Sequence, residues 1–142
     1  MSMELLILFT LKAPPSAQEW QSAMTRNGVP IQITELLDLN EHEGFLPLTY
    51  DSKKSGFYLG HLDYDEIDTD YPEMALSDVE VSAVYSLGFG GNFMECASVF
   101  HSASTLISDF GARAFDTESL SFLDGKDLLA NATKCLELAQ EQ

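Results

Sequence analysis

The strongest constraint on the fold is an apolar run near the start of the chain, "LLILFTL" (residues 5–11). The run is too short to cross a bilayer, because a membrane-spanning helix needs about 20 apolar residues. A half-exposed strand alternates apolar and polar residues, whereas a continuous apolar run is typical of a strand that is buried on both faces. The run therefore predicts a central strand of a sheet inside the molecule.

The composition predicts one folded domain over residues 1–142. The chain is 45% hydrophobic and 11% aromatic, which is richer in core-forming residues than disordered chains are. Its length is sufficient to bury a core without additional cross-links. Cys96 and Cys135 form no Cys-x-x-Cys pair and are too few for a disulfide scaffold. We therefore expect two free, buried thiols that pack as small apolar side chains.

Two strand–helix–strand units flank a less regular middle part. In the first unit, the apolar run precedes a helix that begins with a capping box at Ser16, and a strand follows Pro30. In the second, a strand over residues 79–89 precedes a helix capped by Asn92, and "ARAFD" returns as a strand. A last helix begins near Lys126. This order predicts an α+β fold with a mixed or antiparallel sheet and helices packed on one face, and a ferredoxin-like sheet is the simplest closed arrangement.

The middle of the chain contains an acidic segment, "HLDYDEIDTDYPEM" (residues 61–74), in which Pro72 excludes one continuous helix. The whole chain carries a formal net charge of −16, and residues 55–112 contain no Lys or Arg. A field of one sign repels nucleic-acid phosphates and anionic membranes, and it attracts cation-rich proteins. We therefore expect a basic protein partner, no nucleic acid and no membrane.

The acidic segment combines carboxylates, which pair with Arg and Lys, with tyrosines, which are enriched at interface hot spots. The predicted partner-binding residues are Tyr64, Asp65, Asp68, Asp70, Tyr71 and Glu73. An alternative stays open, because runs of charge are usually only solvated.

A calcium loop is not predicted for the acidic segment. An EF-hand that began at Asp63 would place Ile67 at its fifth position and Asp68 where the turn needs glycine. The starting register at Asp65 fails as well, because its third position is Ile67. We therefore predict no metal site.

The sequence also lacks the motifs that indicate catalysis or nucleotide binding. The glycine-rich turn "LGFGGNF" (residues 87–93) has neither the third glycine of a dinucleotide fingerprint nor the Gly-Lys-Ser/Thr ending of a phosphate loop. There is no Gly-x-Ser-x-Gly elbow and no His-Glu-x-x-His. We expect no enzyme, no catalytic residues and no cofactor.

In size, charge and layout the chain resembles the immunity proteins of bacterial toxin systems, which protect a cell from its own or a sibling's nuclease. An acidic chain of 142 residues with an aromatic and acidic segment carries the resemblance. It implies an inhibitor that covers a basic toxin or nuclease surface, and it transfers no named residue. Glu4 stands where a signal peptide carries positive charge, and no small-residue cleavage site follows. We therefore expect the protein in the cytoplasm.

Two other functions remain open. The chain resembles secretion chaperones in size and charge, but those proteins begin with a helix and this chain begins with a predicted strand. A small-molecule-binding or enzymatic domain is the other alternative, and a deep pocket with convergent polar groups near residues 88–92 would support it.

Overall fold

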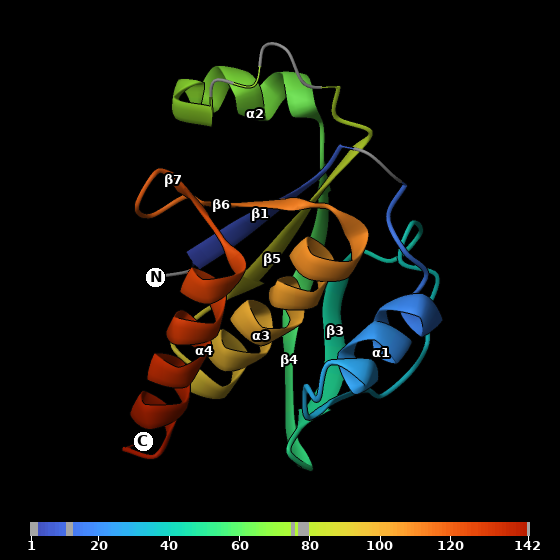
Figure 1. Cartoon of the computed structure of the whole chain (residues 1–142), viewed down its shortest axis with the longest axis vertical. Coiled ribbons are helices and arrows are strands. Elements are labelled where there is room, and N and C mark those ends of the chain that lie inside the picture. Colours follow the sequence, from blue (N-terminus) through green and yellow to red (C-terminus); the bar gives the residue numbers. More distant parts are fainter. Residues whose placement is uncertain (1–2, 11–12, 75, 77–79, 142) are drawn as a thin grey trace.

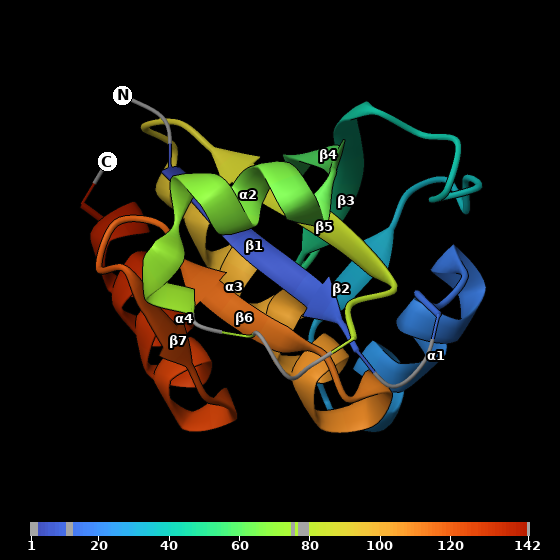
Figure 2. The ribbon, with the colours of Figure 1, turned by 90° about the horizontal axis from the view of Figure 1, so that it is seen from above.

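The computed structural model describes residues 3–10, 13–74, 76 and 80–141. An antiparallel sheet of seven strands, in the order β2-β3-β4-β5-β1-β6-β7, forms its centre, and helices pack against both faces (Figures 1 and 2). The strands are β1 (Met3–Phe9), β2 (Ile31–Ile33), β3 (Gly44–Tyr50), β4 (Lys53–Leu62), β5 (Ala83–Phe89), β6 (Arg113–Asp116) and β7 (Ser121–Leu123). The helices are α1 (Ala17–Arg26), α2 (Tyr64–Asp70), the 3₁₀ helix η1 (Pro72–Met74), α3 (Phe93–Phe110) and α4 (Gly125–Ala139). The predicted α+β class is confirmed.

Strand β1 is the central strand that the apolar run predicts. It pairs with β5 on one side and with β6 on the other, and every side chain from Leu5 to Phe9 is fully buried. Leu5 and Ile7 belong to the larger core cluster, while Leu6 and Leu8 belong to a second cluster on the opposite face. The strand ends at Phe9, and Leu11 of the predicted run lies outside the described residues.

The four strands β6-β1-β5-β4 have the order of a ferredoxin-like sheet. Helix α1 lies in the connection from β1 to β4, and α3 lies in the connection from β5 to β6. Strands β3 and β2 extend this centre at one edge, and β7 extends it at the other. The predicted strand over residues 79–89 begins at Ala83, and residues 77–79 lie outside the described part of the chain.

Helices α1, α3 and α4 cover one face of the sheet, with α3 between the other two (Figure 1). Trp20 of α1 is buried in this layer, and its indole N–H is within hydrogen-bond distance of the Ser102 carbonyl (3.2 Å) and the Thr105 hydroxyl (3.1 Å) of α3. Helix α3 begins at the predicted cap, where the Asn92 side chain accepts from two backbone amides, and it ends at Gly111 with a φ of 66°.

The opposite face carries α2 and η1, so the prediction of helices on one face holds only for α1, α3 and α4. Figure 2 shows α2 above β1, with α3 beyond the sheet. The apolar residues on this face require a cover, because exposed apolar area costs roughly 25 cal/mol per Å². Ile67, Met74 and Leu76 supply it, and all three are buried against Leu6, Leu8, Val84 and Phe115 of the sheet.

A disulfide between Cys96 and Cys135 joins α3 to α4, with 5.8 Å between the two Cα atoms. Both residues are buried, as the sequence predicts, but the prediction of free thiols is wrong. The two cysteines are 39 residues apart in sequence, and only the packing of α4 against α3 brings them together.

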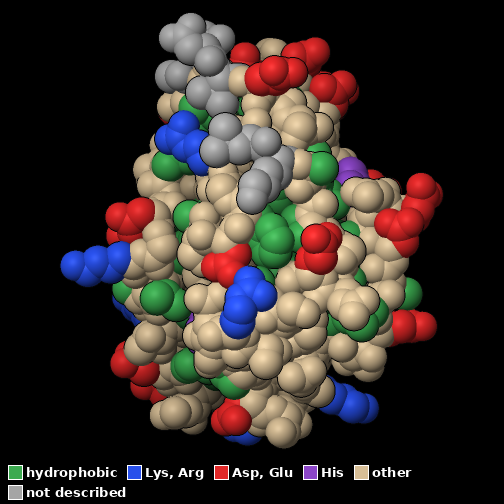
Figure 3. Space-filling model, turned by 45° about the vertical axis from the view of Figure 1, so that its right-hand side comes forward, with side chains coloured by type: hydrophobic (Ala, Val, Ile, Leu, Met, Phe, Trp, Pro, Cys, Tyr) green, Lys and Arg blue, Asp and Glu red, His purple; other side chains and the backbone are tan. Residues whose placement is uncertain are grey.

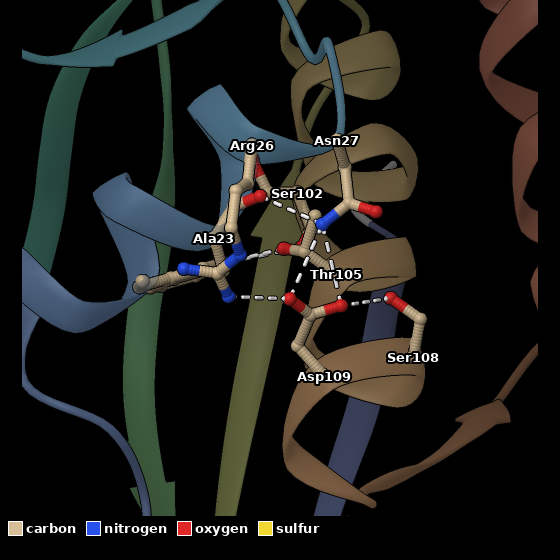
Figure 4. Close-up of polar contacts among 8 residues, drawn as sticks. Ala23, Arg26, Asn27, Ser102, Thr105, Ser108 and Asp109 are labelled. Atoms are coloured by element: carbon tan, nitrogen blue, oxygen red, sulfur yellow. Dashed lines mark hydrogen bonds and ion pairs between the residues drawn. The ribbon is translucent and has the colours of Figure 1, made fainter.

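A polar network joins α1 to α3 on the surface (Figure 4). The Arg26 guanidinium donates to Asp109 Oδ2 at 2.8 Å, and the Asn27 amide donates to both oxygens of the same carboxylate at 3.2 Å. The Ser108 hydroxyl also donates to Asp109, at 2.8 Å. The donated hydrogen bond from Ser108, together with Arg26 and Asn27, lowers the pKa of Asp109 against a smaller opposing effect of burial.

We expect Asp109→Asn to lower the free energy of unfolding at pH 7 by roughly 1 kcal/mol. A carboxylate whose pKa is lower in the folded state stabilises the fold above its unfolded pKa, and this contribution is lost as the pH falls through the folded pKa. The difference from wild type should therefore be present at pH 7 and shrink below about pH 4. Urea unfolding over this pH range tests it, with the exposed Glu35→Gln as control. A difference that is the same at every pH would show that the charge of Asp109 does not matter.

Candidate functional site

The acidic segment folds into a short helical cover whose outer side is charged. Helix α2 begins after Asp63, whose side chain accepts from the Asp65 backbone amide, and it ends before the Tyr71–Pro72 step. The end of the helix agrees with the break that Pro72 predicts. The exposed carboxylates of this region, which we call the acidic surface, belong to Asp63, Asp65, Glu66, Asp68, Asp70 and Glu73.

The two predicted tyrosines lie differently from the predicted acids. Tyr64 and Tyr71 are half-buried and pack against the second core cluster, and the Tyr71 ring lies 5.6 Å from the ring of Phe115. The Tyr64 hydroxyl is 3.5 Å from Asp68 Oδ1, and burial together with the carboxylates of Asp68 and Asp65 raises the pKa of Tyr64. The structure thus brings the predicted acids together on the outside, while the tyrosines mainly attach the helix to the sheet.

No basic side chain of the described residues forms a salt bridge with the acidic surface. The only salt bridge in the described part of the chain joins Arg26 and Asp109, on the α1 side of the molecule. Figure 3 shows acidic side chains gathered at the top of the molecule, where α2 lies in Figure 1. Carboxylates that are crowded without counter-charges repel one another, and this repulsion is relieved when a cationic surface binds.

The geometry of the acidic surface does not form a metal cage. Among the described residues, no three His, Cys, Asp or Glu side chains are placed to hold a metal ion together. Asp65, Glu66 and Asp70 line one shallow, open depression on α2 together with Thr69. The depression is open to solvent, and a broad contact suits it better than an enclosed ligand.

A pocket near the glycine-rich turn bears on the small-molecule alternative. It has a volume of about 520 Å³, and its lining is mainly apolar, with contributions from Met3, Phe89, Phe93 and Cys96. Of its polar lining residues, Thr117 already donates its hydroxyl to the Glu4 carbonyl at 2.8 Å. The pocket therefore has space for an apolar group but few free polar atoms that could orient a ligand.

The histidines take part in internal hydrogen bonds. His101 on α3 is half-buried with its Nδ1 atom 2.7 Å from the Tyr50 hydroxyl, and burial lowers the pKa of His101. His61 Nε2 lies 2.9 Å from the carbonyl oxygen of His42, and His42 Nε2 lies 2.9 Å from the carbonyl oxygen of Phe45. The contacts of His42 and His61 position the loop before β3, and the contact of His101 joins α3 to the end of β3.

The structure reveals two exposed aromatic residues that the sequence reasoning missed. Phe45 on β3 and Tyr58 on β4 are opposite each other in the strand register, with ring centroids 5.2 Å apart. Tyr58 is 58% exposed, the largest exposed fraction among the big hydrophobic side chains of the described residues. The alternation in "SGFYLG", with Phe57 inside and Tyr58 outside, could have indicated it.

None of the described helices is both long enough and apolar enough to cross a membrane. Comparisons with protein-family models, with curated proteins and with solved structures found no match for this chain.

Proposed function

We propose that this chain is an acidic protein-binding domain that inhibits a basic partner, as the immunity proteins of toxin systems do. The observation that carries the proposal is the acidic surface: six exposed carboxylates on one short cover, without a basic partner among the described residues. The proposed partner is a toxin or nuclease with a cationic surface. Enzymes that act on nucleic acids have such surfaces, because they must bind phosphates.

The proposed mechanism is occlusion. The cover is held by Ile67 and Met74 against buried side chains of the sheet, so its carboxylates are displayed on the outer side of a packed cluster. Preorganised charges lose little entropy on binding, and complementary fields increase the rate of association. An inhibitor of this kind competes with a polyanionic substrate for the same cationic cleft, and it needs no catalytic residue of its own.

The test is affinity capture from a lysate of the native cell at about 50 mM and about 300 mM salt, where exposed charges are screened to different extents. The acidic-surface variant carries Asp65→Asn, Asp68→Asn, Asp70→Asn and Glu73→Gln. A control variant removes the same number of charges elsewhere, at exposed positions whose side chains make no hydrogen bond within the described residues. Its substitutions are Glu35→Gln, Glu41→Gln, Glu137→Gln and Glu141→Gln.

We expect a basic protein to be retained by wild type and by the control variant at low salt, and lost from the acidic-surface variant. Higher salt should weaken its retention by wild type. Equal retention by all three proteins would place the contact elsewhere on the fold. Empty lanes for all three would favour the small-molecule alternative, for which the pocket beside Phe89 and Phe93 provides the site.

The disulfide bears on the compartment in which the protein acts. Such bonds persist in oxidising compartments and are rare in the cytoplasm, so the bond between Cys96 and Cys135 weighs against the expected cytoplasmic location. Alkylation of thiols in intact cells decides the matter. Two free thiols would support the cytoplasm, and a protected pair would support an oxidising compartment.

A further inference from the structure

The face of the sheet that carries α2 is covered over only part of its width. The cover packs on Leu6, Leu8, Val84 and Phe115 of β1, β5 and β6. On β3 and β4 the same face remains exposed, and we call this area the open sheet face. Three large side chains there are exposed, Tyr58 at 58%, Phe45 at 38% and Leu62 at 36%.

The strand register shows that these side chains share the face of α2. Tyr58 is opposite Gly88 of β5, and Gly88 is opposite Glu4 of β1. A Cβ atom built on Gly88 would lie 3.9 Å from the Tyr58 Cβ and 3.8 Å from the Glu4 Cγ, so all three residues point to one side. Leu62 is opposite Val84, which α2 covers. The open sheet face therefore continues directly into the cover.

On the open sheet face, one aromatic pair, Phe45 and Tyr58, protrudes above neighbouring glycines. Gly56 and Gly60 of β4 and Gly88 of the neighbouring β5 have no side chains; the Ser86 side chain lies over Gly60, and the low position beside Tyr58 is Gly88. A Cβ atom on Gly56 would lie 2.5 Å from the Phe45 ring, so Phe45 lies over this glycine. The ring of Tyr58 in turn rests edge-on against Phe45. Tyr58 is thus supported by a fixed neighbour while its other side is free to make contacts.

The charge around the open sheet face selects the kind of partner. Lys54, opposite Thr49, lies at the far end of this face, but from residue 55 to residue 112, which includes most of β4 and all of α2 and β5, the chain has no Lys or Arg. Glu4 lies at one end of the row that contains Tyr58, and Asp63 follows Leu62 directly. A second copy of this chain would bring like charges together, since each copy carries a formal net charge of −16.

We infer that the open sheet face is the apolar half of the partner-binding surface, with Tyr58 as its anchor. The occupant is a basic protein segment that presents an aliphatic side chain between Lys or Arg residues. The aliphatic side chain lies over Gly88 beside Tyr58, and the cations pair with the acidic surface. This inference rests on the proposed function and extends it, because the carboxylates attract the partner while Tyr58 selects among cationic partners.

The test is a nuclear magnetic resonance titration of the labelled protein with two synthetic peptides of equal length and charge. In one peptide Arg alternates with Leu, and in the other Arg alternates with Gly. We expect both peptides to shift the α2 amide signals, and only the Arg–Leu peptide to shift those of Tyr58, Gly60 and Gly88. The Arg–Leu peptide should bind about tenfold more tightly, and Tyr58→Ser should remove this difference without unfolding the protein. Leu129→Ser, at a 47% exposed position on α4, is the matched control.

The two proposals fail in different ways. The inference is overturned if the peptides bind equally, or if Tyr58→Ser leaves the preference for Leu intact while α2 still responds to both. The proposed function is overturned as well if neither peptide shifts the α2 signals at low salt. It is also overturned if the acidic-surface variant binds both peptides with the same affinity as wild type.

Discussion

Ile67→Ala is expected to lower the free energy of unfolding by about 2–4 kcal/mol, although the residue lies in the most charged part of the chain. Its side chain is 4% exposed, and it packs with Leu6, Leu8 and Phe115 beneath α2. Truncation removes the main apolar contact that holds a helix of only seven residues on the sheet. Helices this short are not stable alone, so we also expect faster amide hydrogen exchange in α2.

Thr69→Ala is the matched control for Ile67→Ala. Thr69 lies on the same helix but is exposed, and its hydroxyl donates only to the Asp65 carbonyl. We expect its effect to remain within about 0.5 kcal/mol. Urea unfolding and hydrogen exchange measure both variants. Equal small effects would contradict the account, because they would mean that the acidic cover is not attached through its apolar side.

Reduction of the disulfide is expected to lower the free energy of unfolding by about 2–4 kcal/mol. The bond closes a sequence separation of 39 residues, so its loss enlarges the conformational freedom of the unfolded chain. For a domain of this size the change corresponds to a decrease in Tm of roughly 10 °C. Thermal unfolding with and without a thiol reductant measures the shift.

A variant with Cys96→Ala and Cys135→Ala provides the control for reduction. The reductant should not change its Tm, because it has no bond left to break. Thiol titration of the unreduced, denatured wild type should find no free thiol. Two titratable thiols in that sample, or the same reductant effect in the double variant, would contradict the bond between Cys96 and Cys135.

The sequence predicts those parts of the fold that depend on local patterns. The continuous apolar run identifies β1 as a strand buried on both faces, and the structure confirms both the burial and the central position. The capping residues Ser16 and Asn92 locate the starts of α1 and α3, because their side chains bond to the backbone of the next turn. The order of strands and helices predicts the α+β class, but the predicted strand after Pro30, β2, lies at the edge of the sheet, and β4 takes the place beside β5 in the ferredoxin-like centre.

The sequence does not predict features that depend on contacts between distant elements. A strand buried on both faces requires a cover on each face, but nothing local identifies residues 64–74 and Leu76 as that cover. Its anchors Ile67 and Met74 are separated by charged residues and by a proline. The disulfide depends in the same way on the register of α3 against α4.

In the candidate site, too, the sequence predicts local features but not those that depend on contacts between distant elements. Exposure of Asp65, Asp68 and Asp70 follows from residue type, because unpaired carboxylates are very costly to bury. The orientation of Tyr64 and Tyr71 could not be predicted, because it depends on which side of α2 meets the sheet. Tyr58 was missed because its exposure follows from the open part of a sheet face.

The most direct test of the central claim measures stability and binding on the same two variants. The claim is that the carboxylates of the acidic surface serve binding and not folding. With the captured partner, the account predicts that the acidic-surface variant binds about 100-fold more weakly, or roughly 2.7 kcal/mol, than wild type. The control variant should stay close to wild type, and both variants should keep the free energy of unfolding within about 1 kcal/mol. Binding by the acidic-surface variant that is as tight as binding by the control variant would contradict the claim.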